Sequence, residues 1–381
     1  MDFNLSEEHN LIRETVRDFA EREIKPVALE LDEKERFSID LTKKIGELGL
    51  FGMTLPLEYG GQGLDTLSYI IAVEELARVD GSQAATLAAH NSLGIGPIYC
   101  FGTEEQKQEY LPDLCTGNQL WAFGLTEPEA GSDSRGTKTE AKEVDGQWVI
   151  NGSKIFITNG ASEISAGVTV QAITGENNGK KEYSAILVKK GTPGYQSKPL
   201  KGKMMWRSSD TSSMFFENCS VPHENILGEK GQGSHIMLST LDNGRLSIAA
   251  MGLGCAQGAF EAALAYSKER KQFGQVIGKF QAISFKLADM ATKIELARNL
   301  LYKACWLKDA GKAFGKEAAM AKLYCSEIAK EVADEAVQIF GGYGLIKEYP
   351  VERFYRDQRL LQIGEGTSEI QRLVISRFLG L

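Results

Sequence analysis

The sequence has few of the residues that build metal centres or disulfide frameworks. It contains four histidines, and its six cysteines lie far apart without a C-x-x-C pair. Zinc sites need clustered cysteine or histidine ligands, and disulfide scaffolds need many closely spaced cysteines. We therefore expect neither a metal site nor a disulfide framework.

Nucleic-acid and membrane signals are also missing. Lysine and arginine number 43 against 51 acidic residues, the formal net charge is −8, and no basic run occurs. Binding to phosphates needs clustered positive charge, so we expect no nucleic-acid surface. No apolar run approaches the roughly 20 residues of a membrane span. Acidic residues within 1–20 fit neither a signal peptide nor a transit peptide, which predicts a cytoplasmic protein.

Common nucleotide-binding motifs are absent as well. Gly252, Gly254 and Gly258 lack the G-x-G-x-x-G spacing and lie within a helical pattern, and no Walker sequence occurs. Close packing between helices explains these glycines better.

Helical periodicity dominates the first third of the 381 residues. Residues 67–77 are apolar enough for a buried helix, and residues 104–114 are typical of a polar surface helix. Within the small, apolar segment 84–99, His90 and Asn91 either satisfy core hydrogen bonds or line a pocket.

The pattern changes at Trp121, after which apolar residues alternate with a period of two. Asn151-Gly152 and Asn159-Gly160 resemble hairpin turns. No helices separate the strands, which favours an antiparallel sheet or small barrel. The expected strands cover residues 148–150, 155–157, 168–173, 183–188 and 214–216.

Long helical patterns return after the glycine-rich boundary at 228–233 and cover residues 235–270, 280–309, 316–340 and 368–378. The predicted class is α+β. It comprises an N-terminal helical domain (1–120), a middle antiparallel β domain (121–230) and a C-terminal four-helix bundle (231–381).

Glu365 is the candidate catalytic residue. Gly364 and Gly366 leave its carboxylate uncrowded, and the apolar Ile363 and Ile370 imply buried surroundings in which a carboxylate can act as a base. The alternative is an ordinary loop glutamate before a terminal helix.

Five sequence motifs, taken together, are typical of a known protein family. They are WAFGLTEPEAGSD (121–133), FITN (156–159), RKQFG (270–274), QIFGG (338–342) and EGTSE (365–369). Together, and in this order, they resemble the acyl-CoA dehydrogenase family from about residue 4 to residue 380. The resemblance implies the same three-domain fold, an FAD cofactor, an acyl-CoA substrate and electron-transferring flavoprotein as the electron acceptor. It also implies a homotetramer built as a dimer of dimers.

The resemblance further implies which residues contact FAD. Positions matching the isoalloxazine ring, its edge and its N5 are Phe123, Leu125, Thr126, Phe156 and Thr158, followed in the first motif by Gly131 and the pyrophosphate contact Ser132. Positions matching contacts to the ADP half of a neighbouring subunit's FAD are Arg270, Phe273, Gln338, Gly341 and Gly342. Gln272 and Gln281 are two further predicted cofactor contacts. Thr367 and Glu369 match further FAD contacts.

On the substrate side, the resemblance makes Glu365 the base that removes the α-proton of the thioester while a hydride leaves the β-carbon for flavin N5. An apolar acyl chain should raise the pKa of Glu365 by desolvation. Family enzymes of the isovaleryl and long-chain types carry the glutamate at the position of Gly244, which is not possible here. The resemblance implies that Ser132, Asp242 and Arg245 contact the CoA portion. Gly364, Gly366 and Asn91 are the further predicted substrate contacts.

Two departures bear on the substrate. Short- and medium-chain straight-chain enzymes usually have a tyrosine where this chain has Gly364. Its absence opens the acyl pocket and predicts a short branched, cyclic or otherwise bulky acyl group. Glutaryl-CoA dehydrogenases have a pocket arginine where Ala84 stands, so a dicarboxyl substrate is disfavoured. We have no functional account of Met205.

Other functions remain open from the sequence. The same chemistry run backwards would make an enoyl-CoA reductase in a complex with electron-transferring flavoprotein. A flavin-free binding or scaffold protein belongs to a different class, and the presence of Thr158, Arg270 and Glu365 argues against it. An acyl-CoA oxidase is disfavoured because those chains generally run longer.

Overall fold

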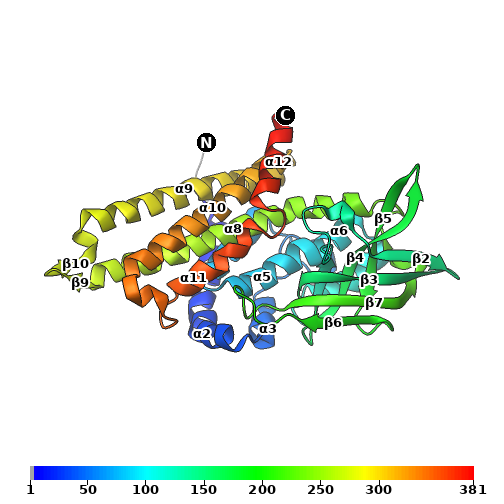
Figure 1. Ribbon diagram of the computed structural model, residues 1–381, viewed down its shortest axis with the longest axis horizontal. Helices are drawn as coiled ribbons and strands as arrows, with labels where there is room; N and C mark the ends of the chain where they lie inside the picture. Colours follow the sequence, from blue (N-terminus) through cyan, green and yellow to red (C-terminus); the bar gives the residue numbers. More distant parts are fainter. Residues whose placement is uncertain (1–3) are drawn as a thin grey trace.

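The computed structural model describes residues 4–381, and residues 1–3 of the predicted first domain lie outside it. A helical N-terminal part leads into a β sheet, and a second helical part follows (Figure 1). This order confirms the predicted architecture. The sheet lies at one end of the molecule and the small β9–β10 ribbon lies at the other.

The N-terminal helices begin where the sequence supplies capping side chains. Asp65 accepts a hydrogen bond from the N–H of Ser68, and Thr103 forms a reciprocal capping box with Gln106. These helices are α1 (Glu7–Phe19), α2 (Lys25–Lys34), α3 (Ile39–Glu47), α4 (Thr66–Ala77), α5 (Gly81–Ala89), α6 (Gly96–Phe101) and α7 (Glu104–Leu114). Two π-helical turns, η1 (Ala20–Ile24) and η3 (His90–Ile95), interrupt them. The predicted buried and surface helices correspond to α4 and α7.

One sheet of eight strands forms the middle of the chain. Its strands are β1 (Leu120–Gly124), β2 (Glu140–Val144), β3 (Gln147–Thr158), β4 (Ser165–Asn177), β5 (Lys180–Lys189), β6 (Tyr195–Pro199), β7 (Thr211–Pro222) and β8 (Ile226–Leu227). The order is β6-β7-β3-β2-β4-β5-β8, and β1 pairs with β4. Most pairs are antiparallel, as expected, but β1 and β4 run parallel along five residue pairs.

The predicted hairpin at Asn151-Gly152 is wrong. β3 continues through both residues, and its register against β7 shifts there, so the dipeptide forms a bulge. A Cβ at Gly152 would lie 2.5 Å from the hydroxyl oxygen of Thr139 on the neighbouring segment, so only glycine fits. Asn159-Gly160 ends β3 without joining paired strands. The actual hairpins turn at residues 145–146 and 178–179, where all four residues have positive φ.

The C-terminal helices agree with the predicted ranges. They are α8 (Gly233–Glu269), α9 (Gln281–Asp309), α10 (Gly315–Phe340) and α12 (Ser368–Phe378), with the short α11 (Val351–Asp357) added. A two-stranded ribbon, β9 (Lys271–Gln272) and β10 (Gln275–Val276), joins α8 to α9. The N-terminal and C-terminal helices share one hydrophobic core, whereas the sheet encloses a separate one around Trp148 and Val170.

Helix α8 lies at the centre of the shared core, packed against α4, α9 and α10. Its glycines allow this close approach, because a Cβ at Gly254 would lie 2.2 Å from the carbonyl oxygen of Glu74. The packing interpretation of these glycines is therefore confirmed. From the sequence we expected no apolar segment long enough to span a membrane. This expectation needs correction, since α8 is long and apolar enough to cross a membrane by length and composition. Of its most apolar 18-residue window, 67% is buried inside the protein, as in a core helix.

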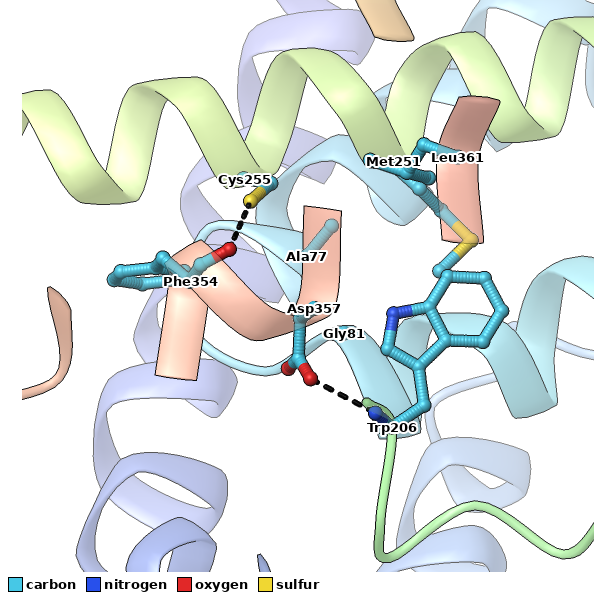
Figure 2. A pocket seen from close by; sticks show the side chains of 8 residues that line it. All are labelled: Ala77, Gly81, Trp206, Met251, Cys255, Phe354, Asp357 and Leu361. Atoms are coloured by element: carbon cyan, nitrogen blue, oxygen red, sulfur yellow. Dashed lines mark hydrogen bonds between the residues drawn. The ribbon is translucent and has the colours of Figure 1, made fainter. Parts of the chain in front are cut away.

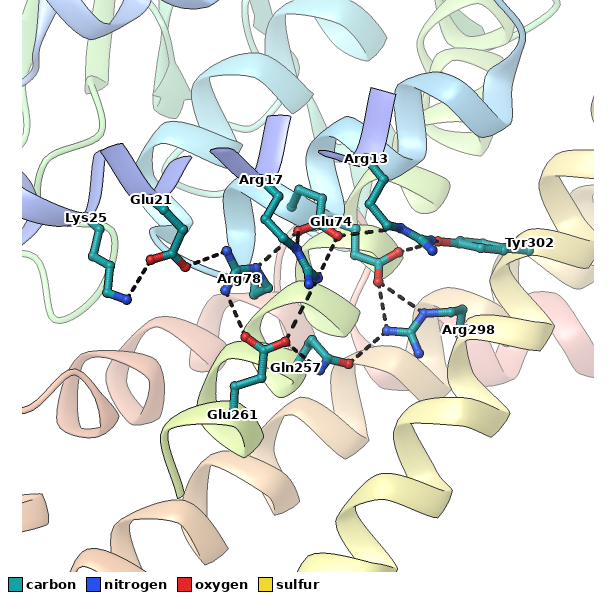
Figure 3. A network of polar contacts seen from close by, with 11 residues as sticks. Arg13, Arg17, Glu21, Lys25, Glu74, Arg78, Gln257, Glu261, Arg298 and Tyr302 are labelled. Atoms are coloured by element: carbon teal, nitrogen blue, oxygen red, sulfur yellow. Dashed lines mark hydrogen bonds and ion pairs between the residues drawn. The ribbon is translucent and has the colours of Figure 1, made fainter. Parts of the chain in front are cut away.

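A network of charged side chains ties α1, α4, α8 and α9 together (Figure 3). The buried Glu75 accepts from Arg17 at 2.8 Å and from Arg78 at 3.1 Å, and Arg78 also pairs with Glu261 at 2.8 Å. The neighbouring buried Glu74 pairs with Arg298 at 2.9 Å. These contacts join the two helical parts of the chain into one unit.

Candidate active site

The loop that carries Glu365 has an unusual backbone. It lies between the 3₁₀ helix η8 (Gln358–Gln362) and α12, with a φ of +52° at Glu365 and +92° at Gly366. The left-handed region is unfavourable for a residue with a side chain, so Glu365 is held there by its surroundings. The φ of Gly366 favours glycine, and a Cβ there would also lie 2.7 Å from Nε2 of Gln371.

The carboxylate of Glu365 lies against Gly244 of α8. A Cβ built on Gly244 would be 1.8 Å from Oε2 of Glu365, so a side chain at position 244 would occupy the carboxylate's place. The residue as a whole is half-buried, but Oε2 is inaccessible to water and has no hydrogen-bond partner within residues 4–381. An unpartnered buried carboxylate oxygen is available to receive a proton from a bound molecule.

Burial also changes the acidity of this group. Desolvation raises the pKa of Glu365 to about 7, although the nearby positive charges of Lys322 and Arg245 act in the opposite direction. At neutral pH a substantial fraction is therefore ionised, and the proton affinity suits a general base.

The predicted CoA-binding residues of α8 lie beside this carboxylate. Arg245 is buried, pairs with Asp242 through Nη1, and leaves its Nε without a hydrogen-bond partner among the described residues. Tyr69 of α4, whose hydroxyl bonds with Ser247 at 2.9 Å, faces the same space. The structure thus brings Asp242, Arg245 and Glu365 together.

The segment predicted to face the flavin ring follows β1 and lies beside β3. The N–H of Ile155 donates to the carbonyl of Thr126 at 3.0 Å, and Nζ of Lys154 donates to the carbonyl of Leu125 at 3.2 Å. Lys154 is itself fixed by a buried ion pair with Glu127 at 2.7 Å. The two motifs expected to contact the isoalloxazine ring are therefore held side by side.

These residues present chemistry that suits a flavin. Phe156 leaves 66% of its surface exposed and has a φ of +60°, so an aromatic face is held open to an incoming ring. The half-buried hydroxyls of Thr126 and Thr158 make no hydrogen bond to any residue between 4 and 381 and are free for flavin heteroatoms. Phe123 lies at the apolar side of this segment. Gly131 and Ser132 are exposed in the following loop.

Leu93 links the segment that is predicted to contact the flavin with the surroundings of Glu365. It packs in one apolar cluster with Phe123 and Leu125. Its Cδ2 also lies 3.2 Å from the Cβ position of Gly244, beside the Glu365 carboxylate. A molecule bound between this segment and Glu365 would therefore contact an apolar wall.

The second set of predicted cofactor residues lies far from Glu365, at the β9–β10 end of the helical part (Figure 1). An open groove of about 540 Å³ is lined there by Arg270, Gln272, Gly341 and Gly342. The Arg270 guanidinium lies over the ring of Tyr343 at 5.3 Å. Nearby, Phe273, Gln281 and Gln338 are exposed, Phe273 to 94%. Within one protomer, the residues predicted to contact the flavin ring therefore lie far from those predicted to contact the ADP half of FAD.

Thr367 is the N-cap of α12 and Glu369 lies in its first turn, shortly after Glu365. The hydroxyl of Thr367 caps this helix by accepting from the N–H of Ile370 at 3.2 Å, and Glu369 is exposed. Both are close to Glu365 in the chain, and the Thr367 side chain caps the helix.

His90 and Asn91 make core hydrogen bonds in this structure. Nε2 of His90 bonds to the carbonyl of Leu114 at 2.8 Å, and Nδ1 accepts from the N–H of Trp121 at 3.1 Å. The amide of Asn91 spans the backbone of Leu50 and Gly52, with bonds of 2.8 and 2.7 Å. These bonds support the core alternative over pocket lining for both residues.

A separate enclosed cavity lies between α4, α5, α8 and α11, at the Trp206 indole (Figure 2). Its volume of about 10 Å³ admits roughly one water molecule, so it is no acyl pocket. Burial and the neighbouring Asp80 raise the pKa of Asp357, which lines it, to about 7. Within residues 4–381 no cluster of His, Cys, Asp or Glu could hold a metal ion.

Sequence reasoning missed Lys322 and Leu93. Lys322 is fully buried on α10 and its Nζ donates to the carbonyl of Gly366 at 2.6 Å. A lysine four residues after Ala318 and three before Cys325, both buried, was a signal in the helical periodicity. Leu93 carried no such signal.

Comparison with known proteins gives consistent results along the whole chain. Family models described as acyl-CoA dehydrogenase N-terminal, middle and C-terminal domains match residues 6–118, 122–219 and 231–380. A short-chain specific acyl-CoA dehydrogenase of Clostridium acetobutylicum is 50% identical over 99% of both chains.

Solved structures agree. The butyryl-CoA dehydrogenase of Megasphaera elsdenii is 45% identical with a TM-score of 0.96, covering 100% of each chain. A chain from a structure described as an electron-transferring flavoprotein of Acidaminococcus fermentans, studied for flavin-based electron bifurcation, is 48% identical with a TM-score of 0.96. That match covers 100% of this chain and 99% of the other. With its fold, its buried carboxylate and these matches, the chain belongs to the acyl-CoA dehydrogenase family of FAD-dependent oxidoreductases.

Proposed function

We propose that this protein removes two hydrogens from the α- and β-carbons of a short acyl-CoA thioester, with Glu365 as the base. The observation that carries the proposal is the buried Oε2 of Glu365, which has no hydrogen-bond partner among residues 4–381 and lies against Gly244, close to Leu93. Its pKa of about 7 lets it take a proton at neutral pH. Relatives described as short-chain and butyryl-CoA dehydrogenases support the short acyl chain.

Residues of this chain would prepare the α-proton for removal. The backbone N–H of Glu365 donates to no acceptor within residues 4–381, so it is free to bind the thioester oxygen and stabilise the developing enolate. Leu93 and the surrounding apolar cluster would exclude water from the reacting carbons. Arg245, with Asp242, would hold the CoA portion.

Bound FAD would supply the acceptor for the β-hydride. Phe123, Leu125, Thr126, Phe156 and Thr158 would hold its ring, with Gly131 and Ser132 next to them. Because the groove at Arg270 lies at the opposite end of the protomer, we place the ADP half of a neighbouring subunit's FAD there. The proposed assembly is a homotetramer, and the proposed electron acceptor is electron-transferring flavoprotein.

For the acyl group we propose a short branched or cyclic chain. A Cβ at Gly364 would make only ordinary contacts, the nearest at 3.5 Å to Leu360, and its φ is not positive. The backbone therefore does not demand glycine at 364, and its presence leaves room beside the acyl chain. A tyrosine there would occupy that room.

Anaerobic titration of the FAD-loaded protein tests the acyl group. The flavin absorbance is followed with butyryl-, isobutyryl-, 2-methylbutyryl-, cyclohexanecarboxyl- and glutaryl-CoA. Branched or cyclic thioesters should bleach the flavin at least as fast as butyryl-CoA, and Gly364→Tyr should slow them about tenfold or more while sparing butyryl-CoA. Much faster bleaching by butyryl-CoA in the wild-type protein would contradict the proposed preference.

The reverse reaction is a second candidate. The match to a chain from the Acidaminococcus structure, described as an electron-transferring flavoprotein and studied for electron bifurcation, supports a complex with electron-transferring flavoprotein, in which the protein would reduce an enoyl-CoA. It predicts that reduced protein is reoxidised by an enoyl-CoA, while no saturated thioester bleaches the oxidised protein.

A further inference from the structure

Helix α10 braces the Glu365 loop at several points. Nζ of Lys322 donates to the carbonyl of Gly366 at 2.6 Å, and the hydroxyl of Ser326 donates to the carbonyl of Leu361 at 2.8 Å. Glu327 accepts from Gln362 at 3.0 Å and from Ser368 at 2.7 Å. Residues on both sides of the base are therefore fixed to less than two turns of one helix.

Lys322 differs from the other braces because it brings a charge into the interior. Its side chain is fully buried, it makes a single hydrogen bond, and among the described residues no carboxylate lies within ion-pair distance of its Nζ. A buried ammonium without a direct ion pair is unfavourable, and Ser326 shows that a neutral group can hold the loop. Holding the loop in place therefore does not explain why a charged side chain occupies position 322.

The negative group that most favours the charged form of Lys322 is Glu365. Arg245, the other cation near the base, is paired with Asp242, whereas Lys322 has no such partner among residues 4–381. Burial lowers the pKa of Lys322 to about 8, so the ammonium still predominates at neutral pH. The titratable and charged groups that face the base or its lysine, from α4, α8, α10 and α12, are Tyr69, Asp242, Arg245, Lys322, Glu327 and Glu369.

We propose that Lys322 is a positioning residue for the base: its ammonium fixes the Glu365 loop through the Gly366 carbonyl and keeps the Glu365 carboxylate ionised until a thioester donates its α-proton. The inference rests on the proposed function of Glu365. The cation weakens the carboxylate as a base but enlarges its ionised fraction at neutral pH. Removing the charge should therefore shift activity toward higher pH.

Exchange of the α-proton with solvent deuterium directly measures the removal of this proton by Glu365. The holoenzyme is kept reduced, so that hydride transfer cannot occur, and exchange into butyryl-CoA and isobutyryl-CoA is followed by mass spectrometry against pH. Lys322→Met removes charge and hydrogen bond, Lys322→Gln removes the charge but keeps a donor, and Lys322→Arg keeps the charge. Ser326→Ala removes a neutral brace.

We expect the midpoint of the exchange profile to rise by about one pH unit or more in Lys322→Met and Lys322→Gln, because an opposite charge near a carboxylate typically shifts its pKa by that amount. Lys322→Arg and Ser326→Ala should keep the wild-type midpoint, whatever their rates. An unshifted midpoint in Lys322→Gln, or in Lys322→Met if only that variant folds with FAD, would overturn the proposal and leave Lys322 a brace. Exchange that persists in Glu365→Gln would instead overturn the proposed function.

Discussion

Replacing Gly244 by alanine should lower the activity of the enzyme without lowering its thermal stability. The new Cβ would lie 1.8 Å from Oε2 of Glu365, while ordinary contacts begin at 3.4 Å, so the carboxylate must move by about 1.6 Å (3.4 minus 1.8). A displacement of about 1 Å at a reacting group can slow catalysis by about 10²-fold, equivalent to about 2.7 kcal/mol. We therefore expect kcat to fall about 100-fold.

Stability should respond in the opposite direction. The atom in the way is the end of a flexible side chain, and alanine is favoured over glycine within a helix by about 1 kcal/mol. The melting temperature of Gly244→Ala should equal or exceed that of the wild type. Gly96→Ala in α6 is the matched control, because its Cβ would touch only the carbonyl of Asn91, at 3.4 Å, and it should keep full activity.

Steady-state kinetics at saturating thioester and thermal melts on the same preparations provide the measurements. A kcat for Gly244→Ala within threefold of the wild type would refute the placement of the carboxylate against α8. A large drop in melting temperature would instead mean that the neighbouring backbone, and not Glu365, absorbs the new methyl group.

Two further predictions concern stability. Glu75→Gln removes a buried partner of Arg17 and Arg78 and should lower the free energy of unfolding by about 3–5 kcal/mol in denaturant titrations, and a loss under about 1 kcal/mol would contradict the assigned network. Asp357 has a pKa of about 7 in the fold against about 3.9 when unfolded, so the folded state binds more protons between these values and loses stability as pH rises through that window. Asp357→Asn should therefore raise the melting temperature relative to the wild type at pH 8 but not at pH 4, and an equal effect at both would show that the carboxyl is not protonated in the fold.

The helices and the order of the domains could be predicted from the sequence. The predicted range 368–378 coincides with α12, and 316–340 differs from α10 by one residue. Long helices repeat their apolar face many times, and caps such as Thr367 mark their beginnings, so local information suffices.

The strand pairing in the sheet was harder to predict because the sequence signals for turns are ambiguous. Asn151-Gly152 has hairpin composition, but its glycine serves a bulge that depends on Thr139 of a distant segment. The true turn at Asn178-Gly179 has the same composition. Pairing between strands decides between these uses, and a single sequence does not record that pairing.

The site shows a similar division. Glu365 could be proposed because flanking glycines distinguish it, and the family resemblance supplied the cofactor residues. Helical periodicity indicates that Lys322 lies on the buried face of its helix, but only the structure shows that the loop of residues 361–368 packs over it. Its role depends on a contact across 44 residues of chain.

The most direct test of Glu365 as the base compares the rate of flavin bleaching in the wild type and in Glu365→Gln under anaerobic conditions. The glutamine has nearly the same shape but cannot accept the α-proton, so the variant should retain FAD and bind the thioester. Its bleaching should be slower by about 10⁴-fold, at the upper end of what general base catalysis contributes. Bleaching within tenfold of the wild type, by any saturated thioester, would show that another group removes the proton.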